Sequence, residues 1–137
     1  MQSARIWYDA DRYPVTLAGL SETLTKDLGY SVQDWAWTLG STVIPQLRVT
    51  GPVRLLMQIE DDPWVEEEAE EFATLLSALL TPEGMGMMLA ANARIAVGDA
   101  PDGPVDPAEP ATHALLLALA RHLAGVFEDN VNGGVAI

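Results

Sequence analysis

The chain has 137 residues, enough for one domain that buries about two-thirds of its surface on folding and needs no metal or disulfide to do so. Its 20 acidic and 7 basic side chains give a formal net charge of −13, which argues against binding nucleic acid or anionic membranes, since both need clustered basic residues. The absence of cysteine excludes disulfides, thiolate metal sites and cysteine nucleophiles.

The N-terminal segment predicts a short strand followed by an amphipathic helix. Residues 5–8 are aromatic and apolar, as in a strand. Leucines recur at steps of three and four over residues 16–28, which places them on one helical face. Gly29 is predicted to end this helix as its C-terminal cap.

Three strands are predicted next. Residues 31–39 carry large side chains at period two, and we expect Trp35 and Trp37 to share one face and to lie in the core. Residues 43–50 contain a proline, which suggests a strand edge or an irregular start. Residues 53–60 alternate strictly between apolar and polar positions, and they are predicted to form a hairpin with the preceding strand.

The next segment predicts an acidic helix over residues 63–80, with Asp62 as its N-cap and Pro63 at its first position. One sector of this helix is apolar and holds Val65, Ala69, Phe72, Leu76 and Leu79. A short helix from residue 81 and a strand over 94–97 are predicted next, followed by an exposed Pro/Asp-rich loop over 99–110. The chain is then predicted to form a helix over 111–124 and strands at 126–127 and 135–137.

This order predicts an α+β fold in a single domain spanning residues 1–137. We expect a mixed, mostly antiparallel sheet with about three helices packed on it, because the middle strands follow one another through turns. The N-terminus lacks the apolar core of a signal peptide and the chain has no cysteine, so we expect a cytoplasmic location.

The acidic helix carries the strongest anomaly. Eight of the twelve residues from 60 to 71 are Asp or Glu. Helix dipoles favour acidic residues in the first turn only, and like charges four residues apart repel. A solvated helix face is one interpretation of this cluster. The sharper interpretation is a surface for a basic protein partner, with an exposed aromatic anchor, made of Trp64, Glu66, Glu67, Glu70 and Glu71.

Motifs for catalysis, metals or cofactors are missing from the sequence. His113 and His122 lie nine residues apart on one predicted helix and face opposite sides, so they cannot share a metal. No serine lies in a nucleophile elbow, and no phosphate-binding loop is present. Residues 128–133 partly mimic a calcium loop but favour a hairpin turn. We therefore predict no catalytic residue, no metal site and no cofactor.

The resulting hypothesis is a non-catalytic acidic protein that masks a basic protein partner. Its most concrete form is a bacterial toxin-immunity protein, a class that this chain resembles only in size, acidity and α+β build. The hypothesis includes a homodimer as a further form of association. The alternative is a small-molecule-binding domain or small enzyme with a pocket between sheet and helices. A third interpretation is generic acidity from a high-salt or GC-rich lifestyle, with no partner for the acidic face.

Overall fold

The computed structural model describes residues 2–136, and that range contains seven strands and four α-helices. The strands are β1 (Gln2–Tyr8), β2 (Ser31–Leu39), β3 (Thr42–Thr50), β4 (Leu55–Glu60), β5 (Ala93–Asp99), β6 (Val126–Asp129) and β7 (Val135–Ala136). The helices are α1 (Leu17–Glu22), which continues as the π-helix η1 (Thr23–Asp27), then α2 (Pro63–Leu75), α3 (Pro82–Ala90) and α4 (Pro110–His122).

All seven strands belong to one antiparallel sheet in the order β2-β3-β4-β5-β1-β6-β7. Alternation along each strand divides its side chains between two faces, and in β1 Ile6 and Trp7 point to opposite faces. The α+β prediction is confirmed, with four helices where the sequence suggested about three. Among these helices, none has the length and apolar character needed to cross a bilayer.

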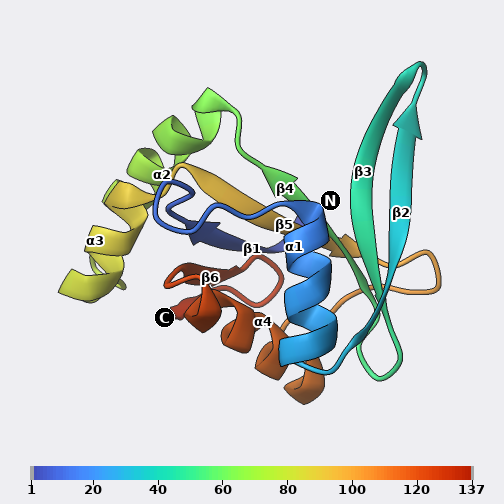
Figure 1. Ribbon diagram of the computed structural model, residues 1–137. Helices are drawn as coiled ribbons and strands as arrows, with labels where there is room; N and C mark the ends of the chain where they lie inside the picture. The colour runs from blue at the N-terminus through green and yellow to red at the C-terminus, as the bar shows by residue number, and fades with distance from the viewer. Residues whose placement is uncertain (1, 137) are drawn as a thin grey trace.

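One face of the sheet, here called the α4 face, carries α1, η1 and α4 (Figure 1). Its core includes Leu20 and Leu24 from the predicted leucine stripe. The Thr16 hydroxyl accepts a hydrogen bond from the Gly19 N–H at 3.0 Å and so caps the start of α1. Gly29 has a φ of 77°, which confirms it as the residue that ends this helical segment. This face holds the larger core of the protein.

The other face, here called the α2 face, carries α2 and α3 over β5, β1 and β6. The predicted long helix is wrong at its C-terminal end, since α2 stops at Leu75 rather than near residue 80. Leu79 consequently lies outside the helix and is exposed instead of buried. Pro63 opens α2 as predicted, whereas the Asp62 side chain makes no capping hydrogen bond. The Thr81 hydroxyl caps α3, which confirms the predicted restart.

The β2–β3 hairpin extends beyond the body of the sheet on the side away from α2 and α3 (Figure 1). The hydrogen-bonded pair Leu39–Thr42 flanks the two-residue turn of the hairpin. Along β3 the backbone N–H and C=O groups of successive residues point alternately toward β2 and away from it, and the nitrogen of Pro45 points away from β2, toward β4. Proline has no N–H to donate, so β3 pairs with β4 only over residues 47–49. The outer part of the hairpin, residues 34–46, is here called the arm.

The elements predicted for the C-terminal region are present, although α4 ends at His122 rather than at residue 124, and residue 137 of the predicted last strand lies outside the described residues. In the β6–β7 turn, the Asp129 carboxylate accepts hydrogen bonds from the N–H groups of Val131 and Asn132 at 2.9 and 2.8 Å, so residues 128–133 form the predicted hairpin turn. The 99–110 loop is mostly exposed, but the buried Val105 side chain fixes its middle to the core of the α4 face.

Candidate functional site

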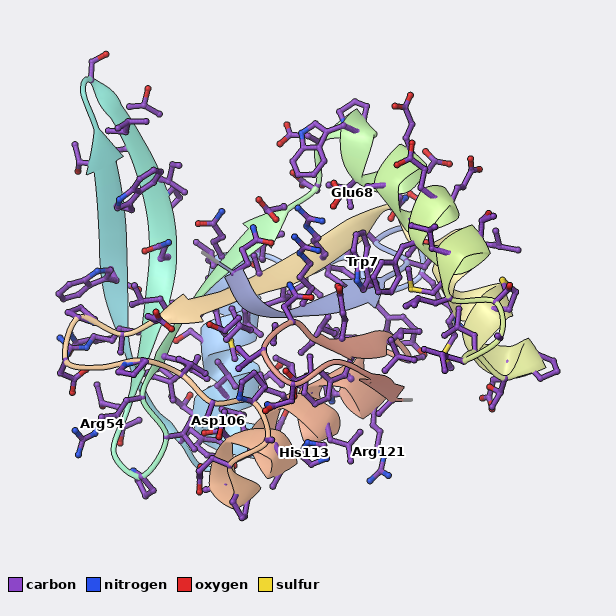
Figure 2. The ribbon with its side chains drawn as sticks, turned by 180° about the vertical axis from the view of Figure 1, so that it is seen from behind. Trp7, Arg54, Glu68, Asp106, His113 and Arg121 are labelled. Atoms are coloured by element: carbon purple, nitrogen blue, oxygen red, sulfur yellow. The ribbon has the colours of Figure 1, made fainter. Side chains whose placement is uncertain are left out.

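Half of the α2 face is closed by helices, and Trp7 lies at its centre. The Trp7 indole is fully buried, stacks on Phe72 of α2 at 5.6 Å between ring centroids, and donates its N–H to Glu128 at 3.0 Å. Figure 2 shows Trp7 beneath α2. The apolar residues packed around it are Val65, Ala69, Ala73, Met88 and Val126. This region, here called the covered half, is a second and smaller core.

The other half of the α2 face has no helix over it. A hollow of about 440 Å³ lies there, and its lining residues define what we call the open half: Gln2, Trp37, Gln46, Leu56, Gln58, Ala96, Gly98 and Asp99. In Figure 2 the arm rises on one side of this region and α2 on the other, with β4 and β5 crossing between them. The arm does not pair with β4, because the β3–β4 ladder is confined to residues 47–49 of β3. The separation of the arm from β4 therefore creates the hollow.

A chain of hydrogen bonds connects the two halves. Gln46 donates to Gln58 at 2.9 Å, and Gln58 donates to Glu60 at 3.4 Å. Glu60 also accepts from Gln2 at 3.0 Å and from Arg94 at 2.6 Å. The Oε1 atom of Gln46 is buried without a partner in residues 2–136. At its α2 end the chain of hydrogen bonds thus has a partner for Glu60, whereas at its arm end one acceptor atom of Gln46 has none in the described residues.

Arg94 closes the network at its α2 end. Its guanidinium lies between two indoles, 4.9 Å from the Trp7 ring and 4.8 Å from the Trp64 ring. It also bonds Glu60 and, at 2.9 Å, Glu68 of α2. The Arg94 side chain is only 4% exposed, so these two carboxylates replace the water that it loses. Arg94 thereby fixes the N-terminal turns of α2 on the sheet.

The network carries more carboxylates than guanidiniums, with Glu60, Glu68 and Glu128 facing Arg5 and Arg94. Burial raises the pKa of Glu128, although the hydrogen bond from Trp7 and the charge of Arg5 at 3.5 Å act in the opposite direction. The network thus holds one more carboxylate than guanidiniums, and burial offsets part of this excess by favouring the neutral form of Glu128.

The five residues predicted to bind a partner all lie on α2, on its solvent side. Trp64 is 42% exposed, as expected for an aromatic anchor. At 3.6 residues per turn, Glu67 and Glu71 lie on the same flank of α2 as Trp64, whereas Glu66 and Glu70 lie on the opposite flank. Within residues 2–136 none of the four glutamates forms an ion pair.

Two expectations about this face need correction. Trp35 and Trp37 share a strand face as predicted, but the core placement is wrong, since Trp37 is 49% exposed and Trp35 is half-buried. Their face belongs to the part of the sheet that no helix covers. Glu68 was absent from the predicted set, yet it turns toward Arg94 while Glu67 and Glu71 face solvent. On the helical wheel Glu68 lies next to Phe72, at the border of the apolar sector, and this position was the sequence signal that Glu68 turns toward the sheet.

A second hollow of about 270 Å³ lies between residues 12–16, α1 and α4, on the other side of the protein. Arg12 and His122 line it beside apolar side chains such as Leu119. The Arg12 guanidinium lies 5.4 Å from the ring centroid of Tyr13. This hollow thus presents basic groups, in contrast to the open half.

The two histidines lie in different surroundings. His113 packs against Phe127 at 5.5 Å between ring centroids, while His122 lines the second hollow. Within residues 2–136, no three His, Asp or Glu side chains are grouped so that they could hold a metal ion.

Comparisons with models of known protein families, with curated proteins and with solved structures returned no match. The function is therefore inferred from the geometry of the molecule alone.

Proposed function

We propose that this protein is a non-catalytic binding module that holds and masks a basic protein partner on the open half, in the manner of a bacterial toxin-immunity protein. The observation that carries the proposal is the uncovered half of the α2 face, where Trp37 is 49% exposed beside a hollow of about 440 Å³. Sheet faces with apolar side chains are normally buried against another layer, and exposed apolar patches with polar rims are typical of protein-binding sites.

The charge distribution of this protein indicates the sign of the partner's charge. Within residues 2–136 only five side-chain carboxylates are in ion pairs. Six of the carboxylates outside ion pairs lie in residues 61–71, at the start of α2 and just before it. Unpaired negative charge concentrated beside a concave surface attracts cationic proteins and speeds their association. Generic acidity explains the net charge but not this concentration at one helix.

The geometry suggests how the partner is held. Trp37 lines the hollow from the arm, while Trp64 on α2 lies 4.8 Å from the guanidinium of Arg94, at the α2 end of the hydrogen-bond network. Large aromatic side chains are frequent binding anchors. Glu67 and Glu71 lie on the flank of α2 that carries Trp64, so a basic side chain docked beside Trp64 comes within their reach. The partner then covers the open half in the same way as α2 covers the covered half.

The two flanks of α2 provide a matched test. The open-half variant is Glu67→Gln/Glu71→Gln, and the control is Glu66→Gln/Glu70→Gln, which removes the same number of charges from the opposite flank. Each form is used as bait in a lysate of cells that express the protein, at low salt and at about 0.5 M salt, where the Debye length is only a few ångströms.

We expect wild type and control to retain the same basic protein at low salt and to lose it at high salt. The open-half variant should retain much less of it, as should Trp37→Ala. Equal loss with both double variants would show that net charge alone attracts the partner. Equal retention by all four baits would overturn the proposed surface.

A small anionic ligand in the second hollow is a second candidate function, favoured by Arg12 and His122 on its wall. A ligand that binds the folded state alone raises the melting temperature. Small carboxylates and phosphates should therefore shift the melting of wild type but not of Arg12→Gln, and the absence of any shift in wild type would contradict this candidate.

A further inference from the structure

The two edges of the sheet differ in length and protection. At one edge, β7 has only two residues. At the other edge, β2 has nine residues in unbroken register with β3, and its only charged residue is Asp34. Natural edge strands are kept from pairing by lysines, prolines, bulges or short length. The β2 edge has none of these protections, whereas β7 is protected by its length.

The backbone groups on the free edge follow from the hairpin register. Leu39 and Thr42 flank the two-residue turn as a hydrogen-bonded pair, so alternate residues of β2 turn their N–H and C=O groups away from β3. The outward residues are Val32, Asp34, Ala36 and Thr38. Within residues 2–136 no strand pairs with this edge.

We propose that a second copy of this chain pairs antiparallel with β2, about a two-fold axis that passes through Trp35. This register pairs all nine residues of the two strands, because Trp35 is the midpoint of β2. It sets Asp34 opposite Ala36 of the other copy, whereas an axis through Asp34 would put two like charges side by side. No other position of the axis pairs the whole strand.

The side chains favour the same occupant. The two Trp35 indoles meet across the axis, and Trp37 comes opposite Gln33 of the other copy. Cross-strand aromatic contacts stabilise antiparallel pairs. Leu39, which is 64% exposed, comes opposite Ser31 of the other copy. A dimer closed by a two-fold axis leaves only the two short β7 edges free, so pairing stops at two copies.

The dimer does not depend on the proposed function. A two-fold axis perpendicular to the sheet keeps both open halves on the same side, so the dimer presents two of them in one surface. Salt separates the two proposals. Each copy has a net charge of −13, so screening strengthens the dimer, whereas it weakens binding to a basic partner.

Sedimentation of the purified full chain tests the dimer. Wild type should dimerise, and more strongly at about 0.5 M salt than at low salt. Ala36→Pro removes one outward N–H without removing a donor from the β2–β3 ladder, so it should sediment as a folded monomer. The matched control is Ala36→Ser, which changes the same exposed position but keeps its N–H and should remain dimeric. A monomeric wild type at both salt concentrations would overturn the proposal.

A cysteine-pairing experiment tests the register without a proline, since the natural chain has no cysteine. Asp34→Cys and Ala36→Cys chains are prepared separately, then oxidised alone and as an equal mixture. Opposed residues in an antiparallel pair lie within disulfide range, and residues two positions out of register do not. Cross-linked dimer should form mainly in the mixture. Equal cross-linking in all three samples, or none in any, would contradict the axis through Trp35.

Discussion

The covered and open halves of the α2 face are built from the same pair of residue types. In the covered half the Arg94 guanidinium lies 4.9 Å from the Trp7 ring, and next to the open half, on the same sheet face, the Arg48 guanidinium lies 4.9 Å from the Trp35 ring. The difference is the layer above them. Helix α2 supplies Glu68 to Arg94, whereas the Nε atom of Arg48 is buried without a partner in residues 2–136.

This difference shows what a helix adds to a sheet face. A buried guanidinium needs carboxylates or other acceptors in place of the water it has lost. The covered half satisfies that need within the chain. Next to the open half, Arg48 has a single carboxylate, Asp102, at 3.5 Å, and within the open half the Oε1 atom of Gln46 has no donor in the described residues. We infer that a partner completes the open half.

Replacing tryptophan in each half should give the largest contrast. Trp7→Ala removes a buried indole, its stacking on Phe72 and its hydrogen bond to Glu128, and should lower the free energy of unfolding by about 3–5 kcal/mol. Trp37→Ala removes a half-exposed ring and should cost about 1 kcal/mol or less. Urea unfolding measures both, and equal losses would contradict the division into two halves.

Replacing arginine sharpens the same contrast with a smaller effect. Arg94→Met leaves Glu60 and Glu68 without their guanidinium and should lower the free energy of unfolding by about 3 kcal/mol. Arg48→Met removes a group that is only partly satisfied and should change it by about 1 kcal/mol or less. The two variants are compared by urea unfolding at neutral pH, where a greater loss in Arg48→Met would reverse the contrast between the halves.

Glu128→Gln should have the smallest effect, and the effect should depend on pH. Burial raises the pKa of Glu128 in the folded protein. The folded protein therefore keeps a proton that the unfolded chain releases near the ordinary pKa of glutamate, about 4.3. The stability from this proton is fully present below that pH and is lost as pH rises through the raised pKa.

A glutamine at position 128 cannot ionise, and it still offers an acceptor to the Trp7 N–H. Relative to wild type, the variant should therefore become more stable as pH rises across this range. Urea unfolding at several pH values from about 4 to about 8 measures the trend. A difference between variant and wild type that does not change with pH would contradict the burial effect.

Much of the fold follows from local sequence patterns. Strict alternation predicted β4, leucine spacing predicted α1 with η1, and Gly29 marked the end of that helical segment. The hydroxyl caps of Thr16 and Thr81 emerged only from the structure, whereas the predicted cap, Asp62, makes no side-chain hydrogen bond. The C-terminal end of α2 did not follow, because the apolar spacing continues to Leu79 while the helix ends at Leu75. Local periodicity identifies a helix better than it identifies the residue where packing stops it.

The candidate site was only partly predictable. The acidic residues around Trp64 offered an exposed anchor as one of two interpretations of this side chain, and the structure leaves Trp64 42% exposed. Period two placed Trp35 and Trp37 on one face, but it contains no information on whether a helix covers that face. The hollow arises where Pro45 ends the β3–β4 ladder, and locating it required knowing which strands are neighbours.

The indole N–H signals of the tryptophans distinguish the two halves within the complex itself, because Trp37 lines the open half and Trp64 is exposed on α2, while Trp7 is buried in the covered half. The captured basic partner is titrated into protein with labelled indoles, and the spectra are recorded by NMR. We predict that the Trp37 and Trp64 signals shift and that the Trp7 signal stays in place. Complex formation that leaves the Trp37 and Trp64 signals unmoved would contradict the open half as the binding surface.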